Sequence, residues 1–149
     1  MASLKQIEGF LSSTPIAMAG VSRNPKKFGH AAFKELREKG LDLIPVNPVA
    51  DEILGVKAYK DLASIPSVVN GVLIMTKKDQ TAGVVREAKE RGIKNIWIQQ
   101  MADSKEAMKV LEGSDINYIT GECILMHYKP HSVHKFHKGI RKLFGVFPK

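Results

Sequence analysis

The segment that follows the first apolar run of the chain has the side chains best suited to binding an anion. It reads Gly20, Val21, Ser22, Arg23, Asn24, Pro25, Lys26 and Lys27. Arg23, Lys26 and Lys27 can neutralise phosphate charges, and Ser22 and Asn24 can add hydrogen bonds. The glycine at its start lets the backbone turn sharply and lets a ligand approach closely. These residues predict a phosphate-binding loop.

A helix is predicted directly after this loop, over residues 30–39. The free N–H groups of its first turn and the positive end of its dipole form a natural phosphate site. The loop is not a G-x-G-x-x-G fingerprint, because Ser22 stands at the second glycine position, and no Gly-Lys-Ser/Thr of a P-loop follows. From the loop alone, a basic surface loop without a ligand is an equal alternative.

The residues after the second predicted strand narrow the choice of cofactor. Domains that bind NAD usually place an Asp or Glu there to hold the ribose hydroxyls. This chain has Asn47 and Pro48 instead. Because a carboxylate would repel a phosphate on that ribose, its absence favours a cofactor with a ribose phosphate, which leaves NADP or coenzyme A.

The elements that must position these loops alternate along the chain. Short apolar runs predict strands at residues 15–20, 41–46, 68–75, 95–98 and 117–119. Between and around them, helices are predicted at residues 3–11, 30–39, 61–64, 78–91 and 104–112. This alternation predicts an α/β fold, a Rossmann-like, doubly wound parallel sheet of about five strands with flanking helices. Ligands in this architecture bind at the carboxyl ends of the strands.

The bulk properties indicate one soluble domain over residues 1–149. The chain has 149 residues and a single cysteine, Cys123, so no internal disulfide can form. No signal peptide or membrane span is visible, and we expect a cytoplasmic protein. The net charge is +8, but every charged residue after Glu122 is basic, so the body is nearly neutral. The charge therefore gives little support for a nucleic-acid partner.

The end of the chain predicts a basic amphipathic helix appended at residues 131–149. Its apolar positions, at helical spacing, are Val133, Phe136, Ile140, Leu143, Phe144 and Phe147. We expect this side to pack on the body or on a second subunit in a homodimer, in preference to a membrane or RNA. His127, His131, His134 and His137 are interpreted as surface histidines of this region in preference to a metal site.

Four segments together resemble a known family. Residues 16–27, 43–48, 97–99 and 121–124 resemble the small stand-alone CoA-binding proteins, which are similar to the N-terminal nucleotide-binding domain of the succinyl-CoA synthetase α subunit. The resemblance covers about residues 14–128. It implies a Rossmann-like fold with coenzyme A bound across the strand ends.

The resemblance also implies roles for individual positions. Asn47 and Pro48 would flank the adenosine, and Thr76 and Lys77 would contact the adenine side or a phosphate. Gln99 would lie where the pantetheine passes. The full predicted cofactor-binding set is Gly20, Val21, Ser22, Arg23, Asn24, Pro25, Lys26, Lys27, Asn47, Pro48, Met75, Thr76, Lys77 and Gln99.

The sequence predicts binding without catalysis by this chain alone. It contains no Ser-His-Asp order and no paired carboxylates, and in the succinyl-CoA synthetase relationship the phosphorylated histidine belongs to a second domain. We therefore expect a module that binds coenzyme A or a short acyl-CoA, or a partner of an enzyme. An NADP-dependent oxidoreductase is the alternative, although no Tyr-x-x-x-Lys is present. Cys123 is interpreted as a small buried residue, with a mixed disulfide to the CoA thiol as the alternative hypothesis.

Overall fold

The computed structural model describes residues 2–128, and every structural statement below concerns these residues. The predicted helix at residues 131–149 lies outside them. The elements in chain order are α1 (Leu4–Leu11), β1 (Ile16–Ala19), α2 (Phe28–Glu38), β2 (Leu43–Val46), β3 (Glu52–Ile53), β4 (Val56–Lys57), β5 (Gly71–Ile74), α3 (Lys78–Glu90), β6 (Asn95–Gln99), α4 (Lys105–Leu111), β7 (Asn117–Glu122) and the short 3-10 helix η1 (Ile124–Met126).

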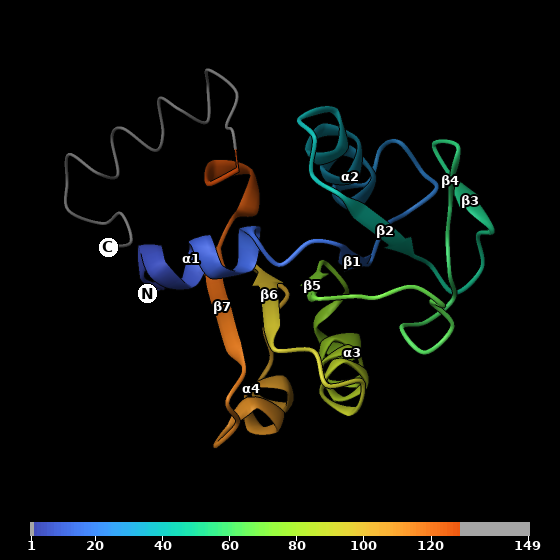
Figure 1. The fold of residues 1–149 in the computed structure, drawn as a ribbon. Helices are drawn as coiled ribbons and strands as arrows, with labels where there is room; N and C mark the ends of the chain where they lie inside the picture. The colour runs from blue at the N-terminus through green and yellow to red at the C-terminus, as the bar shows by residue number, and fades with distance from the viewer. Residues whose placement is uncertain (1, 129–149) are drawn as a thin grey trace.

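The main sheet has five parallel strands in the order β2-β1-β5-β6-β7 (Figure 1). From β1 the chain moves outward to β2, returns to pair β5 on the other side of β1, and then continues outward to β6 and β7. The strand order therefore reverses between β1 and β5. This arrangement confirms the predicted Rossmann-like fold, and the reversal marks its topological switch point.

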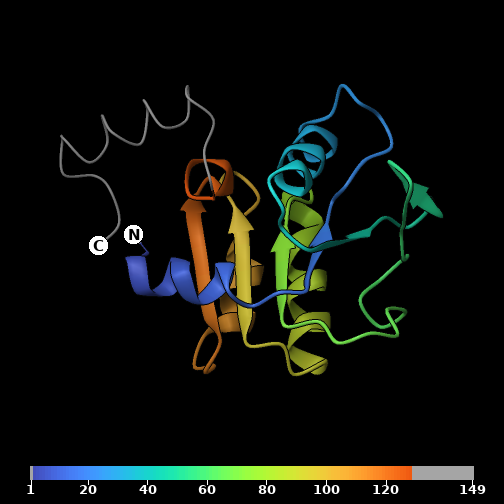
Figure 2. The same cartoon turned by 45° about the horizontal axis from the view of Figure 1, so that its top comes forward.

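Helices cover both faces of the sheet, which explains why its central strands are apolar throughout. All four residues of β1 and all four of β5 are buried. On one face, α1 and α2 enclose a core that includes Phe10, Phe33 and Trp97. On the other face, α3 and α4 enclose a core that includes Val85 and Ile98 (Figure 2). With both faces covered, alternation of polar and apolar residues disappears.

Pro45 lies in β2, where a missing N–H group would normally weaken a sheet. The Pro45 carbonyl accepts from Tyr59 N at 3.0 Å, on the side away from β1. Asp42 O accepts from Ile16 N at 3.0 Å on the opposite side, towards β1. Because N–H and C=O of one strand residue point the same way, the missing donor of Pro45 faces the outer edge of the sheet. The proline therefore costs β2 no hydrogen bond with β1.

Three local predictions were wrong. No helix forms at residues 61–64, where Asp61 Oδ1 accepts from Ser64 N at 2.9 Å in a turn. The strand predicted at residues 68–75 begins only at Gly71, and α2 begins at Phe28 instead of residue 30. The β3–β4 hairpin was not predicted.

His127, predicted to lie at the surface, is buried. Its Nε2 lies 3.0 Å from Glu122 Oε1, and the two side chains are 1% and 4% exposed. Trp97 packs beside the imidazole, with ring centroids 5.7 Å apart, and its indole Nε1 donates to Glu122 O. The correction has a physical reason: the chain turns inward at η1 and places His127 against the carboxylate at the end of β7.

Candidate functional site

The carboxyl ends of β1 and β5 approach each other closely at Gly20. The residue has a φ of 91°, and a Cβ atom there would lie 2.5 Å from both Met75 C and Met75 O. Only glycine fits both the conformation and the space. Beyond this point the chain leaves β1 for α2 on one face and leaves β5 for α3 on the other, and in doubly wound sheets this switch point is the position of the ligand crevice.

Helix α2 begins right at this crevice, because its second residue also has no side chain. A Cβ atom at Gly29 would collide with the carbonyl oxygen of Gly20. The N-cap residue, Lys27, makes no side-chain cap hydrogen bond. Within the part of the chain that the structure describes, the N–H groups of Phe28, Gly29 and His30 have no acceptor, since the first helical bond runs from Ala31 N to Lys27 O. Three N–H groups are therefore directed out of this helix end.

Helix α3, which follows β5, begins at a similar residue, but its third N–H group is satisfied, because Gln80 N donates to Lys77 O at 2.9 Å. Its N-cap residue is Lys77, again without a side-chain cap hydrogen bond. By contrast, α1 and α4 are each capped by a serine: Ser3 accepts from Gln6 N, and Ser104 accepts from Ala107 N. Among the described α-helices, the two that flank the crevice begin at a lysine and lack a cap.

The predicted phosphate loop is held in shape by its own hydrogen bonds. Ser22 Oγ accepts from Asn24 N at 3.0 Å, and Asn24 Oδ1 accepts from Lys26 N at 3.0 Å. His30 Nδ1 lies 2.7 Å from Ser22 O. A carbonyl can only accept, so Nδ1 carries the proton and donates. His30 is thus a residue of the site that the sequence reasoning missed; its place in the first turn of a helix after a polar loop was the only available signal.

The loop after β2 joins the loop after β1 in one shallow groove. Asn47 Nδ2 donates to Val21 O at 2.8 Å, and Asn47 Oδ1 accepts from the N–H groups of Val49 and Ala50, each at 2.8 Å. Val21 itself is buried in the core. The groove has a volume of about 460 Å³ and is lined by Ser22, Arg23, Asn24, Asn47, Pro48 and Val49.

The cations predicted to bind phosphate are exposed and unpaired. Arg23, Lys26 and Lys27, with Pro25 between them, all lie at the surface. The ion pairs found in residues 2–128 join Lys39 to Glu35, Lys94 to Asp115 and His127 to Glu122, and so involve none of the three. Their charge is available to a ligand.

A buried threonine connects the loops after β5 and β6. Thr81 is fully buried and lies in the first turn of α3. Its single hydroxyl proton is donated to Ala102 O at 2.6 Å, so Thr76 is the donor in the 2.9 Å contact between the two hydroxyls. Thr76 Oγ1 can therefore offer a ligand only its lone pairs. Met75 and Thr76 are half-buried, and Lys77 is exposed. Thr81 was not predicted.

Gln99 and Cys123 lie together at the far end of the same sheet edge. Gln99 is the last residue of β6 and pairs in register with Glu122, the last residue of β7. Its Oε1 accepts from Ile124 N at 3.1 Å. Cys123 follows Glu122 directly and is partly buried, so it is more accessible than the small core residue that the sequence favoured.

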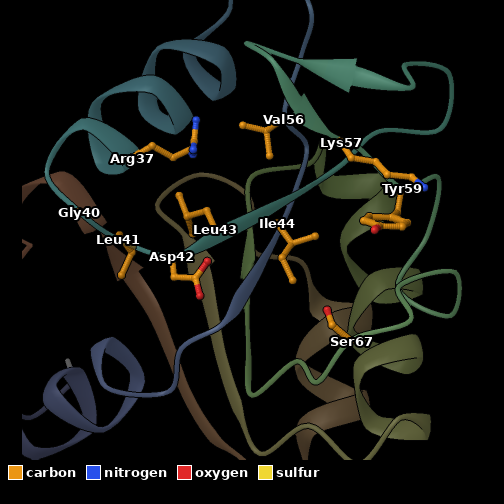
Figure 3. Close-up of a pocket in the computed structure, with 10 residues that line it drawn as sticks. All are labelled: Arg37, Gly40, Leu41, Asp42, Leu43, Ile44, Val56, Lys57, Tyr59 and Ser67. Carbon is orange, nitrogen blue, oxygen red and sulfur yellow. The ribbon is translucent and has the colours of Figure 1, made fainter.

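A pocket of about 460 Å³ lies elsewhere, at the outer edge of β2 (Figure 3). Its lining residues include Arg37 of α2, Val56 of β4 and Tyr59, with Asp42 just before β2 and Ser67 further along the chain (Figure 3). It contains none of the predicted cofactor-binding residues. We therefore place the candidate site at the carboxyl edge of the sheet and not in this pocket.

The sheet is doubly wound, and its switch point lies beside a helix start that is basic and has no cap. These features define a Rossmann-like cofactor-binding domain. Comparison with known proteins identifies the family within this class. Residues 14–129 match the family described as the CoA binding domain, and the chain belongs to that family.

Two relatives show the range of proteins that carry this domain. The uncharacterized protein YneT of Bacillus subtilis is 34% identical over 112 residues, which cover 75% of this chain and 83% of YneT. The α subunit of acetate–CoA ligase [ADP-forming] II of Pyrococcus furiosus is 37% identical over 93 residues, which cover 62% of this chain. The match spans only 20% of that subunit's length.

The fold agrees with solved structures of similar proteins. A conserved hypothetical protein from Pyrococcus furiosus superposes with a TM-score of 0.70 at 37% identity, covering 74% of this chain and 95% of that one. A hypothetical protein from Pyrococcus horikoshii OT3 gives a TM-score of 0.76 at 30% identity, covering 81% and 86% of the two chains. Within residues 2–128, no helix has the length and apolar character needed to cross a bilayer.

Proposed function

We propose that this protein binds coenzyme A or a short acyl-CoA, with the diphosphate at the start of α2. The N–H groups of Phe28, Gly29 and His30 would donate to the diphosphate oxygens, and Lys27 would add positive charge. Three donors at a helix N-terminus with a neighbouring cation are a recurrent phosphate-binding arrangement. Membership in the CoA binding domain family supports this ligand class.

The observation that carries the proposal is the distribution of helix caps. A serine caps the first turn of α1, which precedes the sheet, and of α4, which follows β6. At the switch point, α2 and α3 have lysines in the same position, and the first three N–H groups of α2 have no protein acceptor in the described chain. In α3 the third N–H group is satisfied, because Gln80 N donates to Lys77 O. Uncapped helix starts cost stability. Their position at the crevice indicates that an anionic ligand supplies the missing acceptors.

The positions proposed for the adenosine and the pantetheine follow from the groups that neighbour the helix start. The groove formed by Ser22–Asn24 and Asn47–Val49 adjoins the helix start on the β2 side and is the place for the adenosine. Arg23 borders this groove and can pair with a phosphate on the ribose. In the other direction the sheet edge leads to Gln99, towards which the pantetheine would extend.

Titration calorimetry with coenzyme A, dephospho-CoA and NADP tests this proposal. We expect coenzyme A to bind with one site per chain and dephospho-CoA to bind more weakly, because it lacks the ribose phosphate. Binding of NADP without binding of coenzyme A would favour the oxidoreductase alternative and reject the proposal.

A pair of variants tests the location of the site. Arg23→Ala removes a cation from the groove, whereas Lys34→Ala removes one from the exposed side of α2, outside the site. We expect the first to weaken coenzyme A binding more than dephospho-CoA binding and the second to leave both unchanged. Equal effects of the two variants would place the ligand elsewhere.

A further inference from the structure

The only cysteine of the chain lies at the same sheet edge as the proposed coenzyme A site. Cys123 follows β7 directly and is partly exposed. It packs against the core on the face of the sheet that α1 and α2 cover. Trp97 belongs to the same core, and Gln99, two residues further along β6, lies on the same face because strand side chains alternate. Cys123 and Gln99 therefore share one face at one edge.

Gln99 has a buried hydrogen-bond donor without a protein partner. The residue is 5% exposed, and its Oε1 is bound to Ile124 N. That bond fixes the orientation of the amide and places it against the Cys123–Ile124 peptide. Within residues 2–128, Nε2 donates to no acceptor. An unsatisfied buried donor costs about 1–3 kcal/mol, so its position at the end of β6, next to the peptide that follows Cys123, points to a ligand with an acceptor oxygen.

The spacing of the strands relates this pair to the diphosphate site. Gly20 follows β1 and Cys123 follows β7, and these strands are separated by β5 and β6 in the sheet order. Three inter-strand spacings correspond to about 14 Å. The extended pantetheine arm, with its two amide units, has about this length. A CoA derivative anchored at α2 and extended along the sheet edge thus brings its sulphur close to Cys123.

We propose that Cys123 accepts the acyl group of a short acyl-CoA thioester bound at this site, an inference that rests on the proposed function. Cys123 Sγ forms a bond to the carbonyl carbon, and the bond from that carbon to the CoA sulphur breaks. The proton of the cysteine thiol ends on the CoA thiol. The products are an S-acyl cysteine and free coenzyme A, and no oxidant or reductant is needed.

Gln99 Nε2 is the donor for the thioester oxygen. Negative charge develops on this oxygen when the thiolate attacks, and a preorganised amide donor stabilises it. Cysteine is nucleophilic enough to attack a thioester without a neighbouring base. The reaction is stoichiometric, one acyl group per chain, so it adds an acyl-carrying step to the binding function and requires no further catalytic group.

Mass spectrometry of the full chain after incubation with acetyl-CoA tests the proposal. We expect the mass to increase by one acetyl group, which peptide mapping places on Cys123 and hydroxylamine removes. Cys123→Ser should show no hydroxylamine-sensitive adduct. Acetylation confined to lysines would overturn the inference, as would an adduct that reductants remove, since the latter is a disulfide with coenzyme A.

A matched pair of variants separates the donor role of Gln99 from its structural role. Gln99→Glu keeps the oxygen that accepts from Ile124 N but removes the Nε2 donor, whereas Gln100→Glu makes the same change at the exposed neighbour. At saturating acetyl-CoA we expect Gln99→Glu to slow acylation about 100-fold and Gln100→Glu to have no effect. Equal rates in both variants would reject the assignment of Gln99.

Coenzyme A binding, measured by calorimetry on the same preparations, keeps the two proposals distinguishable. If coenzyme A binds but acetyl-CoA leaves Cys123 unmodified, the acyl-transfer inference fails and the proposed function stands. If neither coenzyme A nor acetyl-CoA binds, the proposed function fails and the inference with it.

Discussion

The substitution Lys27→Ser tests directly whether the start of α2 is kept free for a ligand. Lys27 is the N-cap of α2, with φ −84° and ψ 143°. Ser3, the N-cap of α1, has nearly the same conformation, with φ −82° and ψ 162°, and its side chain accepts from the N–H group three residues later. A serine at position 27 can therefore adopt the capping geometry without strain and accept from His30 N.

The expected effects on stability and on binding have opposite signs. A new serine cap is worth about 1 kcal/mol of folding free energy. For a domain of this size this corresponds to a rise in melting temperature of about 3 °C. The same cap occupies one N–H group that the diphosphate would use. A hydrogen bond to a charged group contributes about 1.5–3 kcal/mol. Its loss should weaken coenzyme A binding about 10- to 100-fold.

Lys26→Ser is the matched control, since it removes a neighbouring exposed cation without creating a cap. Thermal unfolding and calorimetry with coenzyme A are measured on both variants. We expect Lys27→Ser to be the more stable of the two and the weaker binder. If it is more stable but binds coenzyme A as tightly as Lys26→Ser does, the helix amides are not the anion site and the reasoning is refuted.

Three further predictions concern the support of the site. Thr81→Val should lower the unfolding free energy in chemical denaturation by about 1–3 kcal/mol, because Thr76 Oγ1 and Ala102 O lose their buried partner; an unchanged midpoint would contradict the network. Gly20→Ala should lower the unfolding free energy by more than Gly113→Ala, because both glycines have positive φ but only Gly20 has backbone within 4 Å of the added Cβ. Equal losses would show that the loop after β5 moves to make room for the added methyl group. Burial raises the pKa of Glu87, whose carboxylate accepts from Leu62 N. Its stabilising contribution is therefore present below the unfolded pKa near 4.5 and is lost as the pH rises through the folded pKa. Glu87→Gln should gain stability relative to the parent as the pH rises from 4 to 7, and a constant difference would contradict this.

Helix starts were predicted closely for α1, α3 and α4 and were missed for α2. Ser3 and Ser104 stand at the starts of α1 and α4, and those starts were predicted within one residue. Helix α2 carries no such signal, since Lys27 is not a capping residue, and its start was predicted two residues too late. The start of α3 was predicted at Lys78 although α3 has no side-chain cap either, so a missing cap does not by itself hide a helix start. At α2 the N-cap lysine that gave no start signal belongs to the feature that carries the proposed function.

The hairpin of β3 and β4 and the buried pair at the end of β7 could not have been predicted from local patterns. Strands of two residues are too short to show a period, and the turn requires Leu54 to adopt a φ of 51°, which its residue type does not indicate. His127 resembled the basic histidines that follow it in sequence. Its burial depends on Trp97 and Glu122, which only the folded sheet brings to it.

The candidate residues could be predicted because the residue types of a loop indicate its chemistry without its geometry. The sequence could not tell which of these residues hold the site in shape and which are left to bind a ligand. Asn47 was predicted as an adenosine contact, yet three of its hydrogen bonds hold the groove together. Gln99 was predicted as a pantetheine contact, and one half of its amide instead secures Ile124. In Asn47 both ends of the amide hold the groove, since Nδ2 donates to Val21 O, whereas in Gln99 one end shapes the site and Nε2 is left over. Asparagine and glutamine suit such a position because a single side chain supplies both an acceptor for the fold and a donor for a ligand. A carboxylate at position 99 could keep the first role and would lose the second, which is why substitution of Gln99 by Glu separates the architecture of this edge from its chemistry.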